Sequence, residues 1–367
     1  MSTKPTIGIS KYKNINGVTC YMNSILAILQ QTEIFTDYIV SGKFKNLLEL
    51  NNPELDIETT IIFQLHKLFC VSLSIDNGTV TPTSLRVACA EKDTIYNRWA
   101  SRQQQDSPDF LLFILEKITE EIGQKITFIP GKVPQDNIIT KDISQNKLNQ
   151  LISTIDFNNM VKSEFSPLTN IFNGLEHATT QCSVCKNKNS KFETFKVLEI
   201  EIPEIEKELE LQDCLDKWSE DEVLDDVNRY LCSFCGIKSN AIRKHMLMKT
   251  PKILIIHIKR FKKDMYGRIV GKNNRKINFP INDFSITKYI SPSSQDLNKS
   301  LYNLYAVNCH YGMGSSQINF GHYISLVKNR YNNKWYNFND SCEPIQLTTI
   351  NELVSQNSYI LFYVRSN

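Results

Sequence analysis

Two CxxC pairs constrain the fold of this chain more than any other feature. The pairs are Cys182/Cys185 and Cys232/Cys235, and the 46 residues 186–231 separate them. This spacing is typical of a tetrahedral structural zinc site, which requires the two segments to meet in space. The polar flanks in CSVCKNKNS and CSFCGIKSN favour zinc over the alternative of ordinary buried cysteines. Four thiolates would close the site, so we expect a structural rather than a catalytic Zn²⁺.

The composition describes a globular chain without a strong charge. The 367 residues are 41% hydrophobic and 22% charged, which lies in the ordinary globular range. The 42 basic and 39 acidic residues leave a net charge of +3, so we expect neither nucleic acid nor a membrane as partner. A zinc-ribbon nucleic-acid module is the alternative that the CxxC pairs suggest, but no aromatic and basic stripe accompanies them.

The hydropathy pattern argues against export and against membrane insertion. The longest apolar stretches, such as LLFILEKI and ILIIHIKRF, are far shorter than the roughly 18 to 20 residues that span a bilayer. The opening MSTKPTIGISKYKN lacks the apolar core of a secretory signal. We therefore interpret the ten cysteines as reduced thiols of a cytoplasmic or nuclear protein rather than as a secreted disulfide framework.

The first half of the chain is predicted to be mainly helical. In CYMNSILAILQQTEIF the apolar residues recur at helical spacing, so a helix should begin at or just after Cys20. A tight turn at Asn16 and Gly17 precedes it. In QQQDSPDFLLFILEKI, Asp106 or Ser107 is the predicted cap, a proline follows in the first turn, and the apolar surface runs nearly all round. That second helix should be buried.

The second half is predicted to be β-sheet. FETFKVLEIEI alternates apolar and polar residues, and we predict further strands in KILIIHIKRF, YNLYAVNCH, HYISLVK, KWYNF and YILFYV. Residues 131–166 are polar and poorly periodic, which indicates an insertion or an irregular crossing. SPSSQDLNKS, residues 291–300, is predicted to be a mobile surface loop. The fold class is therefore α+β.

Cys20 is a candidate nucleophile because it lies where a helix should start. A thiol becomes nucleophilic when its pKa falls, and a helix N-terminus and a nearby imidazolium both have that effect. Most free cysteines are buried and inert, so the position alone does not decide the role. The cysteines without a comparable setting are interpreted as structural: Cys70, Cys89, Cys214, Cys309 and Cys342.

A partner for this thiol is predicted in the second half. GHYISLV places His322 at a strand start, and KWYNFND places Asn339 and Asp340 after the next strand. Two antiparallel strands would bring these side chains together, and an imidazole held by a third group is the base of Cys-His-Asn and Cys-His-Asp sites. His310 is the closest rival, but it lies inside a strand pattern. The other histidines are interpreted as surface or satisfied core residues: His66, His177, His245 and His257.

These motifs resemble those of the ubiquitin-specific protease family, a family of papain-like cysteine peptidases. NINGVTCYMNSILAIL resembles the cysteine box, QQDSPDFLLFIL the glutamine-containing segment, and YAVNCHYGMGSSQINFGHYISLV with KWYNFNDS the histidine box. TPKILIIHIKRF and SYILFYV match further landmarks in the right order. The resemblance covers about residues 10–365, which implies a single catalytic domain. Its parts would be a helical thumb mainly in 10–165, zinc-binding β fingers in 180–245, and a β-sheet palm mainly in 250–365.

The resemblance implies a deubiquitinase, which hydrolyses the isopeptide or peptide bond after the C-terminal glycine of ubiquitin. Cys20 would attack the glycine carbonyl, His322 would act as general base and then acid, and Asn339 would orient His322. Asp340 would support the site, and a role as a turn residue capping the hairpin is equally compatible. The partner would be ubiquitin or a ubiquitinated protein, the protein would be a monomer, and the zinc would be structural.

One position departs from the family pattern. The family's oxyanion asparagine stands five residues before the nucleophile, where this chain has Ile15. An apolar side chain cannot donate a hydrogen bond, and loss of one such donor typically costs roughly 10² to 10³ in rate. Either Asn14 or Asn16 then substitutes, or the Cys20 amide acts alone. We favour Asn16, because it is next to the flexible Gly17.

The resemblance also predicts contacts with ubiquitin. Asp106 and Asp109 match acidic positions that meet the ubiquitin tail and its arginines, and helix capping is compatible with that role. The loops at 312–320 and 267–276 contain glycines and polar residues, so we expect them to move when ubiquitin enters.

Two alternatives to an active deubiquitinase stay open. A catalytically weak or inactive ubiquitin-binding pseudoenzyme or adaptor is favoured by Ile15 and opposed by the complete set of Cys20, His322 and Asn339. Within the enzyme hypothesis, the substrate could be a ubiquitin-like modifier rather than ubiquitin.

Overall fold

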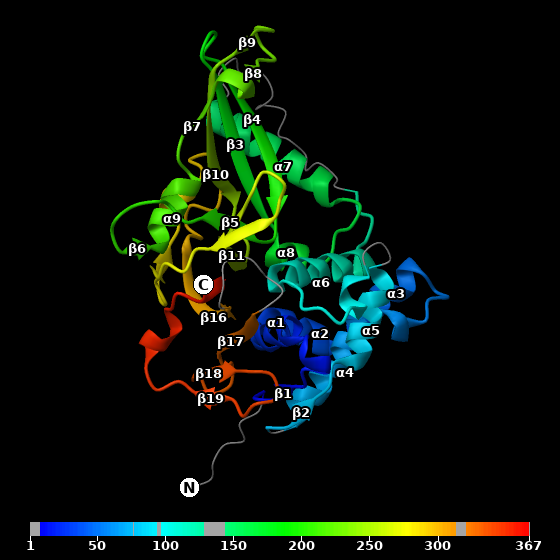
Figure 1. Cartoon of the computed structure of the whole chain (residues 1–367). Helices are drawn as coiled ribbons and strands as arrows, with labels where there is room; N and C mark the ends of the chain where they lie inside the picture. Colours follow the sequence, from blue (N-terminus) through cyan, green and yellow to red (C-terminus); the bar gives the residue numbers. More distant parts are fainter. Residues whose placement is uncertain (1–7, 76, 94–96, 128–143, 313–320, 367) are drawn as a thin grey trace.

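A cluster of helices, which we call the thumb, forms the first half of the molecule. The computed structural model describes residues 8–75, 77–93, 97–127, 144–312 and 321–366. The thumb is drawn in blue and cyan in Figure 1. Its elements are α1 Cys20–Gln31, α2 Glu33–Ser41, α3 Phe44–Asn51, α4 Ile61–Ser74, α5 Thr83–Lys92 and α6 Ser107–Ile122, with 3-10 turns at Ile15–Gly17, Ile57–Thr59 and Arg98–Ala100. Within the described ranges, no helix is long and apolar enough to cross a membrane.

The two predicted helices, α1 and α6, lie at the centre of the thumb. α1 begins at Cys20, and all 12 of its residues are buried. α6 begins at Ser107 with Asp106 at the N-cap and a proline in the first turn, where a missing N–H costs no hydrogen bond. Tyr21 of α1 packs edge-on against Phe110 of α6, with ring centroids 5.7 Å apart. Both predictions are confirmed, and the helix that starts at the candidate nucleophile is held by packed side chains.

A mixed sheet of 8 strands, which we call the palm, packs against the thumb. Its hydrogen-bonded order is β19-β18-β17-β16-β20-β11-β5, and β15 pairs with β16. The strands are β5 Leu198–Glu201, β11 Ile253–Lys259, β15 Phe284–Ser285, β16 Leu301–Tyr311, β17 His322–Lys328, β18 Trp335–Phe338, β19 Ile345–Gln346 and β20 Ser358–Arg365. Ile253 and Ile255 of β11 join the thumb core, whereas Leu254 and Ile256 join a second core on the opposite face. Burial on both faces explains the continuous apolar run in this segment.

A second sheet, which we call the fingers, projects from the palm and is drawn in green at the top of Figure 1. Its order is β4-β3-β10-β7. The strands are β3 Gly174–Cys182, β4 Lys188–Phe195, β7 Glu222–Leu224 and β10 Ala241–Lys249, and the pair β8 Tyr230–Leu231 and β9 Lys238–Ser239 lies beyond them. β3 ends at the first cysteine of one CxxC pair, and the β8–β9 hairpin carries the other pair.

Short elements complete the described part of the chain. The helix α9 Leu211–Trp218 packs in the second core, against the palm face opposite the thumb. The β12–β13 hairpin, Phe261–Lys263 and Ile269–Lys272, follows β11. The others are β1 Lys11–Tyr12 paired with β2 Thr79–Val80, β6 Leu209–Glu210 paired with β14 Ile277–Asn278, α8 Thr169–Phe172, and 3-10 turns at Asp226–Asn228, Thr287–Tyr289 and Ile350–Leu353.

The segment between thumb and fingers contains a helix where the sequence predicted an irregular crossing. α7 spans Gln145–Val161 and begins after Ser144, whose hydroxyl accepts a hydrogen bond from a backbone N–H in the first turn. Phe157 and Val161 pack against the finger sheet. Because α7 buries few apolar side chains and its remaining residues are mostly polar, the helical period is weak in the sequence. Residues 131–143 of the predicted crossing lie outside the described residues.

The segment 291–300 is a surface loop, as predicted, but its serines and Asp296 are buried, and its mobility stays a prediction. The Ser294 hydroxyl donates to the Met248 carbonyl at 2.6 Å. The buried carboxylate of Asp296 accepts a hydrogen bond from the Thr250 N–H at 2.9 Å. The serines and the aspartate therefore bind backbone groups near the β10–β11 connection, and composition alone does not distinguish that role from exposure to solvent.

Candidate active site and metal centre

The candidate nucleophile lies at the N-terminus of α1. Cys20 is the first residue of the helix and is 0% exposed. The chain reaches it through the predicted turn, in which Asn16 has a φ of 55° and Gly17 a φ of 71°. The Thr19 carbonyl accepts the N–H of Asn23 at 2.9 Å and so closes the first helical turn. The sulfur therefore lies at the end of the helix that carries partial positive charge.

The candidate base and its partner lie on neighbouring palm strands. His322 begins β17, and Asn339 directly follows β18, which pairs with β17 in antiparallel register. Nε2 of His322 lies 2.6 Å from Oδ1 of Asn339. The hairpin predicted from the sequence is confirmed.

The base also contacts the thiol. A hydrogen bond with Cys20 raises the pKa of His322 to about 9, against the lowering effect of burial, and Asn339 and the charge of Asp340 act in the same direction as the thiol. Because Nε2 faces Asn339, Nδ1 is the ring nitrogen left for the sulfur. The structure thus brings Cys20, His322 and Asn339 together where thumb and palm meet, and this set can perform nucleophilic acyl transfer.

The comparison with family models covers nearly the whole chain. The model described as "Ubiquitin carboxyl-terminal hydrolase" matches residues 12–363. This chain belongs to the ubiquitin carboxyl-terminal hydrolase family. The predicted membership is confirmed, and the bounds predicted for thumb, fingers and palm stay predictions.

Curated relatives in the family are similar over most of this chain. "Ubiquitin carboxyl-terminal hydrolase Usp2" of Drosophila melanogaster is 28% identical over 98% of this chain and 35% of its own length. "Probable ubiquitin carboxyl-terminal hydrolase R319" of Acanthamoeba polyphaga mimivirus is 28% identical over 100% of this chain and 92% of its own length. Human "Ubiquitin carboxyl-terminal hydrolase 2" is 27% identical over 99% of this chain and 56% of its own length. The chain thus spans about a third of the fly relative and about half of the human one.

Two solved structures have the same fold as this chain. A SAGA DUB module of Ubp8, Sgf11, Sus1 and Sgf73, bound to monoubiquitin, matches with a TM-score of 0.72 and 21% identity over 100% of this chain and 71% of that one. The "SAGA Ubp8/Sgf11/Sus1/Sgf73 DUB module bound to ubiquitin aldehyde" matches with a TM-score of 0.70 and 22% identity over the same shares. The predicted α+β fold is confirmed.

Asp340 connects the segment that carries Cys20 to the hairpin that carries His322. The residue has a φ of 48° in the turn after β18. Its carboxylate accepts the side-chain amide of Asn14 at 2.8 Å and that of Asn23 at 2.7 Å. Asn14 precedes Cys20 and Asn23 follows it in α1, so this carboxylate ties the nucleophile segment to the histidine hairpin. The sequence analysis missed Asn23.

Of the two candidate oxyanion residues, Asn14 is the one tied into the site. Its Oδ1 accepts the N–H of Thr19 at 2.8 Å, and the N–H of Ile15 donates to the Thr19 hydroxyl at 2.8 Å. Asn16 is exposed in the preceding turn. The oxyanion assignment of Asn16 stays a prediction, and the geometry gives it less support than it gives Asn14.

The two acidic residues predicted to meet ubiquitin differ in their surroundings. The Asp106 carboxylate accepts the hydroxyl of Tyr323 at 2.7 Å and that of Tyr359 at 3.0 Å, and its pKa is raised, mainly by burial. Its side chain does not cap α6. Asp109 is 59% exposed and lies 4.0 Å from Arg98. Both roles toward ubiquitin stay predictions.

The two predicted mobile loops have not been tested. Residues 267–276 include the end of the turn and the second strand of the β12–β13 hairpin, and Gly267 has a φ of 77° in that turn. Of the other loop, residues 313–320 lie outside the described residues. Movement on substrate entry stays a prediction for both.

The four CxxC cysteines come together at the far end of the fingers. Their ligand atoms all lie within 4.8 Å of one another, with 4.0 Å between the sulfurs of Cys182 and Cys235 and 3.6 Å between those of Cys185 and Cys232. A tetrahedral ion with bonds of about 2.3 Å to sulfur separates its ligands by about 3.8 Å. The arrangement therefore fits a metal ion bound by four thiolates.

A buried asparagine that the sequence analysis missed joins thumb and palm. Asn308 of β16 is 0% exposed, donates to the Ser24 hydroxyl at 2.9 Å, and accepts from the Ser107 hydroxyl at 2.8 Å. Ser24 lies in α1 and Ser107 begins α6, so one side chain links both central helices to the palm. The signal in the sequence was an amide at an apolar position of the strand YNLYAVNCH.

His310 is buried beside the site and carries no charge at neutral pH. Burial, together with Lys272 and His322, lowers its pKa to about 3. Its ring lies against Tyr323, with centroids 4.7 Å apart. A Cβ at Gly321 would overlap this ring, which explains the glycine before His322. His310 therefore shapes the site rather than exchanging protons in it.

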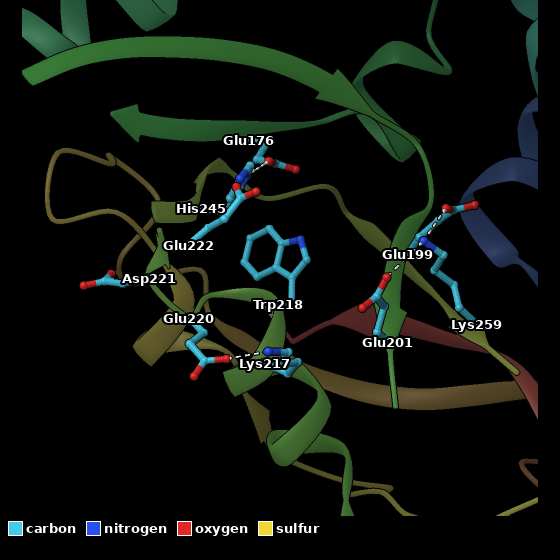
Figure 2. Close-up of a pocket in the computed structure, with 10 residues that line it drawn as sticks. All are labelled: Glu176, Glu199, Glu201, Lys217, Trp218, Glu220, Asp221, Glu222, His245 and Lys259. Atoms are coloured by element: carbon cyan, nitrogen blue, oxygen red, sulfur yellow. Dashed lines mark hydrogen bonds and ion pairs between the residues drawn. The ribbon is translucent and has the colours of Figure 1, made fainter. Parts of the chain in front are cut away.

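An acidic pocket lies between fingers and palm, away from the thiol. Figure 2 shows Trp218 of α9 standing between Glu176 and His245 of the fingers on one side and Glu201 and Lys259 of the palm on the other. Six carboxylates and two lysines line this pocket of about 420 Å³. The surface is suited to a basic partner.

Proposed function

We propose that the protein is a deubiquitinase, a thiol-dependent hydrolase of the isopeptide or peptide bond after the C-terminal glycine of ubiquitin. The observation that carries this proposal is the contact among Cys20, His322 and Asn339 in a member of this family. Relatives named ubiquitin carboxyl-terminal hydrolases support it, including a mimivirus protein of which the match covers 92%. The two structural neighbours were solved with monoubiquitin and with ubiquitin aldehyde.

In the first half of the proposed reaction, the sulfur of Cys20 attacks the glycine carbonyl carbon. His322 holds the thiol proton, because its pKa of about 9 keeps the imidazole charged at neutral pH. As the tetrahedral intermediate collapses, His322 gives this proton to the lysine nitrogen, which leaves as the amine. A thioester between Cys20 and ubiquitin remains. Asn339 fixes the ring so that one nitrogen keeps facing the sulfur.

In the second half, water hydrolyses the thioester. His322, now neutral, accepts a proton from a water molecule whose oxygen attacks the thioester carbonyl. The carbon–sulfur bond breaks, ubiquitin leaves with a free carboxylate, and the thiolate of Cys20 again faces the protonated imidazole. One base thus serves both half-reactions.

The oxyanion would be stabilised by the Cys20 amide and by Asn14. The amide lies at the helix N-terminus, where the first-turn N–H groups have no partner within the helix. The Asn14 amide would turn from Asp340 toward the oxyanion. Supporting this assignment, the Thr19 N–H holds the other end of the Asn14 side chain beside Cys20.

The metal in the fingers would be Zn²⁺, held by Cys182, Cys185, Cys232 and Cys235. Zn²⁺ favours four thiolates in a closed structural site. When bound, the ion would crosslink β3 to the β8–β9 hairpin, and these cysteines would position the end of the fingers.

The body of ubiquitin would cover the acidic surface in Figure 2, and its Leu-Arg-Gly-Gly tail would enter between thumb and palm. Asp109 supports this orientation because its exposed carboxylate lies in the first turn of α6, near the tyrosines that meet Asp106. An arginine of the tail would pair with it.

We further propose that the protein acts as a monomer in the cytoplasm or nucleus, without nucleic-acid or membrane partners. None of the ten cysteines forms a disulfide, which suits a reducing compartment. The near balance of 42 basic and 39 acidic residues is consistent with a protein partner.

Reaction with ubiquitin that carries a C-terminal electrophile tests the proposal. The full protein should form a covalent adduct and turn over a fluorogenic ubiquitin conjugate, and Cys20→Ala should do neither. A ubiquitin-like modifier with the same electrophile is the specificity control, and its preferential capture would reassign the substrate. Ubiquitin binding without an adduct would instead support the pseudoenzyme adaptor, for which Ile15 at the usual oxyanion position is the motivating observation.

A further inference from the structure

A cavity of about 640 Å³ lies at the opposite end of the thumb–palm junction from the thiol. The thumb lines it with the end of α1 and the start of α2, between Gln31 and Asp37. The palm lines it with the first residues of β11 and β16 and with the ends of β17 and β20. We call it the junction pocket.

The junction pocket is distinct from the active site, yet the same two elements reach both. α1 begins at Cys20 and ends at Gln31 in the pocket, a length of roughly 18 Å. β17 begins at His322 and ends at Lys328 in the pocket, a length of roughly 23 Å. An occupant would therefore bind the far ends of the elements that carry the thiol and the imidazole.

The rim of the junction pocket has unbalanced positive charge. Four cationic side chains line it against two carboxylates. Arg330 pairs with Asp37 at 2.5 Å, and Arg365 donates to the carbonyl of Thr250 at 3.2 Å. Lys252 and Lys328, in contrast, form no ion pair with any other residue that the structure describes. Two ammonium groups on one rim thus face the carboxylate of Glu33, which is unpaired among the described residues, and the remaining positive charge suits an anionic partner.

Apolar side chains line part of the walls between these charges. Ile253 and Leu304 are each 2% exposed, whereas Ile34 and Val364 are 36% and 38% exposed and open toward solvent. A buried hydrogen bond of 2.9 Å between Thr32 and Tyr305 lies among the lining residues. A ligand must therefore offer carboxylates to the rim and an apolar side chain to the walls.

We propose that the junction pocket is a docking site for an acidic peptide segment of a partner protein, with one bulky apolar side chain between its carboxylates. The charges of Lys252 and Lys328 favour an anionic partner. The apolar side chains in the walls favour a peptide over a small inorganic anion, because an inorganic anion has no apolar group to place against them. The first seven residues of the chain are a poor alternative, because they include a lysine and no carboxylate. The proposal is independent of the deubiquitinase activity.

Fluorescence anisotropy with a labelled peptide, acetyl-Glu-Asp-Leu-Glu-Asp-amide, tests this proposal on the full protein. We expect saturable binding that weakens as salt is added, because Lys252 is exposed and Lys328 is partly exposed, so salt screens both charges. Lys252→Glu/Lys328→Glu should weaken binding at least tenfold. Lys43→Glu/Lys276→Glu, which makes the same change in net charge elsewhere, should leave it unchanged. Circular dichroism confirms that both double variants fold.

Two further peptides test which chemical groups the junction pocket recognises, and hydrogen exchange tests where the peptide binds. Replacing the central leucine by glycine should weaken binding. A peptide in which lysine replaces each acidic residue should not bind. Hydrogen exchange should slow in 33–37 and 326–330 when the acidic peptide is bound. Any of four results would overturn the proposal. The acidic peptide does not bind, both double variants lose the same affinity, the glycine or lysine peptide binds tightly, or hydrogen exchange slows in other segments. A dimer formed through this face would be detected by sedimentation and would also overturn it.

Discussion

The charge on His322 depends on three neighbours from two parts of the chain. Cys20 comes from the thumb, and Asn339 and Asp340 come from the turn after β18. All three favour the protonated ring, and the resulting pKa of about 9 is above the ordinary value for histidine. A base of this kind is charged in the resting enzyme, so the proton needed by the leaving amine is already in place.

We expect kcat/KM to fall as the pH rises through about 9, because deprotonation of His322 removes the imidazolium. The raised pKa also stabilises the fold below the unfolded pKa, and that contribution is lost as the pH rises through about 9. Asp340→Asn should move the alkaline limb to lower pH, because it removes a charge that raises this pKa. Profiles from pH 6 to 10 with fluorogenic ubiquitin measure the shift. Glu343→Gln, at an exposed carboxylate nearby, is the control, and an equal shift there would contradict the assignment.

Asn14 and Asn16 should differ sharply in their effect on turnover. Asn14→Ala removes the proposed oxyanion donor and one hydrogen-bond donor to Asp340, so kcat should fall roughly 10² to 10³-fold. Asn16→Ala changes an exposed turn residue and should leave kcat close to wild type. Steady-state kinetics of both variants, with KM reported separately, make the comparison. The opposite order would restore Asn16 as the donor.

At the scale of elements, the sequence predicts what is periodic and misses what depends on tertiary contacts. α1, α6 and the palm strands were predictable because their apolar residues repeat at the helical or strand period. α7 and the burial within segment 291–300 were not, because polar side chains there bind partners that are remote in the chain. The same reason led the sequence analysis to favour Asn16 over Asn14, since nothing in the sequence indicates the hydrogen bond between Asn14 and Asp340.

Removal of metal should affect the fingers more than the thiol. Without an ion, four thiols in close contact no longer hold β3 to the β8–β9 hairpin, so the end of the fingers should loosen. We expect KM for ubiquitin conjugates to rise roughly tenfold or more after treatment with a chelator, with kcat little changed. Hydrogen exchange in 230–239 and the alkylation rate of Cys20 measure the two effects separately. A parallel loss of Cys20 reactivity would show that the metal supports the whole domain.

At the scale of the molecule, one buried amide joins the two lobes that form the site. Asn308 reaches Ser24 of α1 and Ser107 of α6 from the middle of the palm. The catalytic groups lie on opposite sides of this junction, so its rigidity sets the distance between thiol and imidazole.

Asn308→Ala should lower the free energy of unfolding by about 1–3 kcal/mol, because the buried Ser107 hydroxyl loses its acceptor and the Ser24 hydroxyl loses its donor, keeping only its bond to the Tyr21 carbonyl. Urea unfolding measures this. Asn303→Ala, on the same strand but partly exposed, is the matched control and should cost less. An equal cost at both positions would mean that the junction is not a stabilising feature.

The position of β20 has a consequence for how the protein is made. This strand comes last among the described elements, yet it lies between β16 and β11 in the interior of the palm. A nascent chain that has already exposed Cys20, His322 and Asn339 therefore still lacks a central strand of the sheet that positions them. We expect ribosome-bound chains to stay inactive until translation has passed residue 365, so that the timing of synthesis itself prevents premature proteolysis.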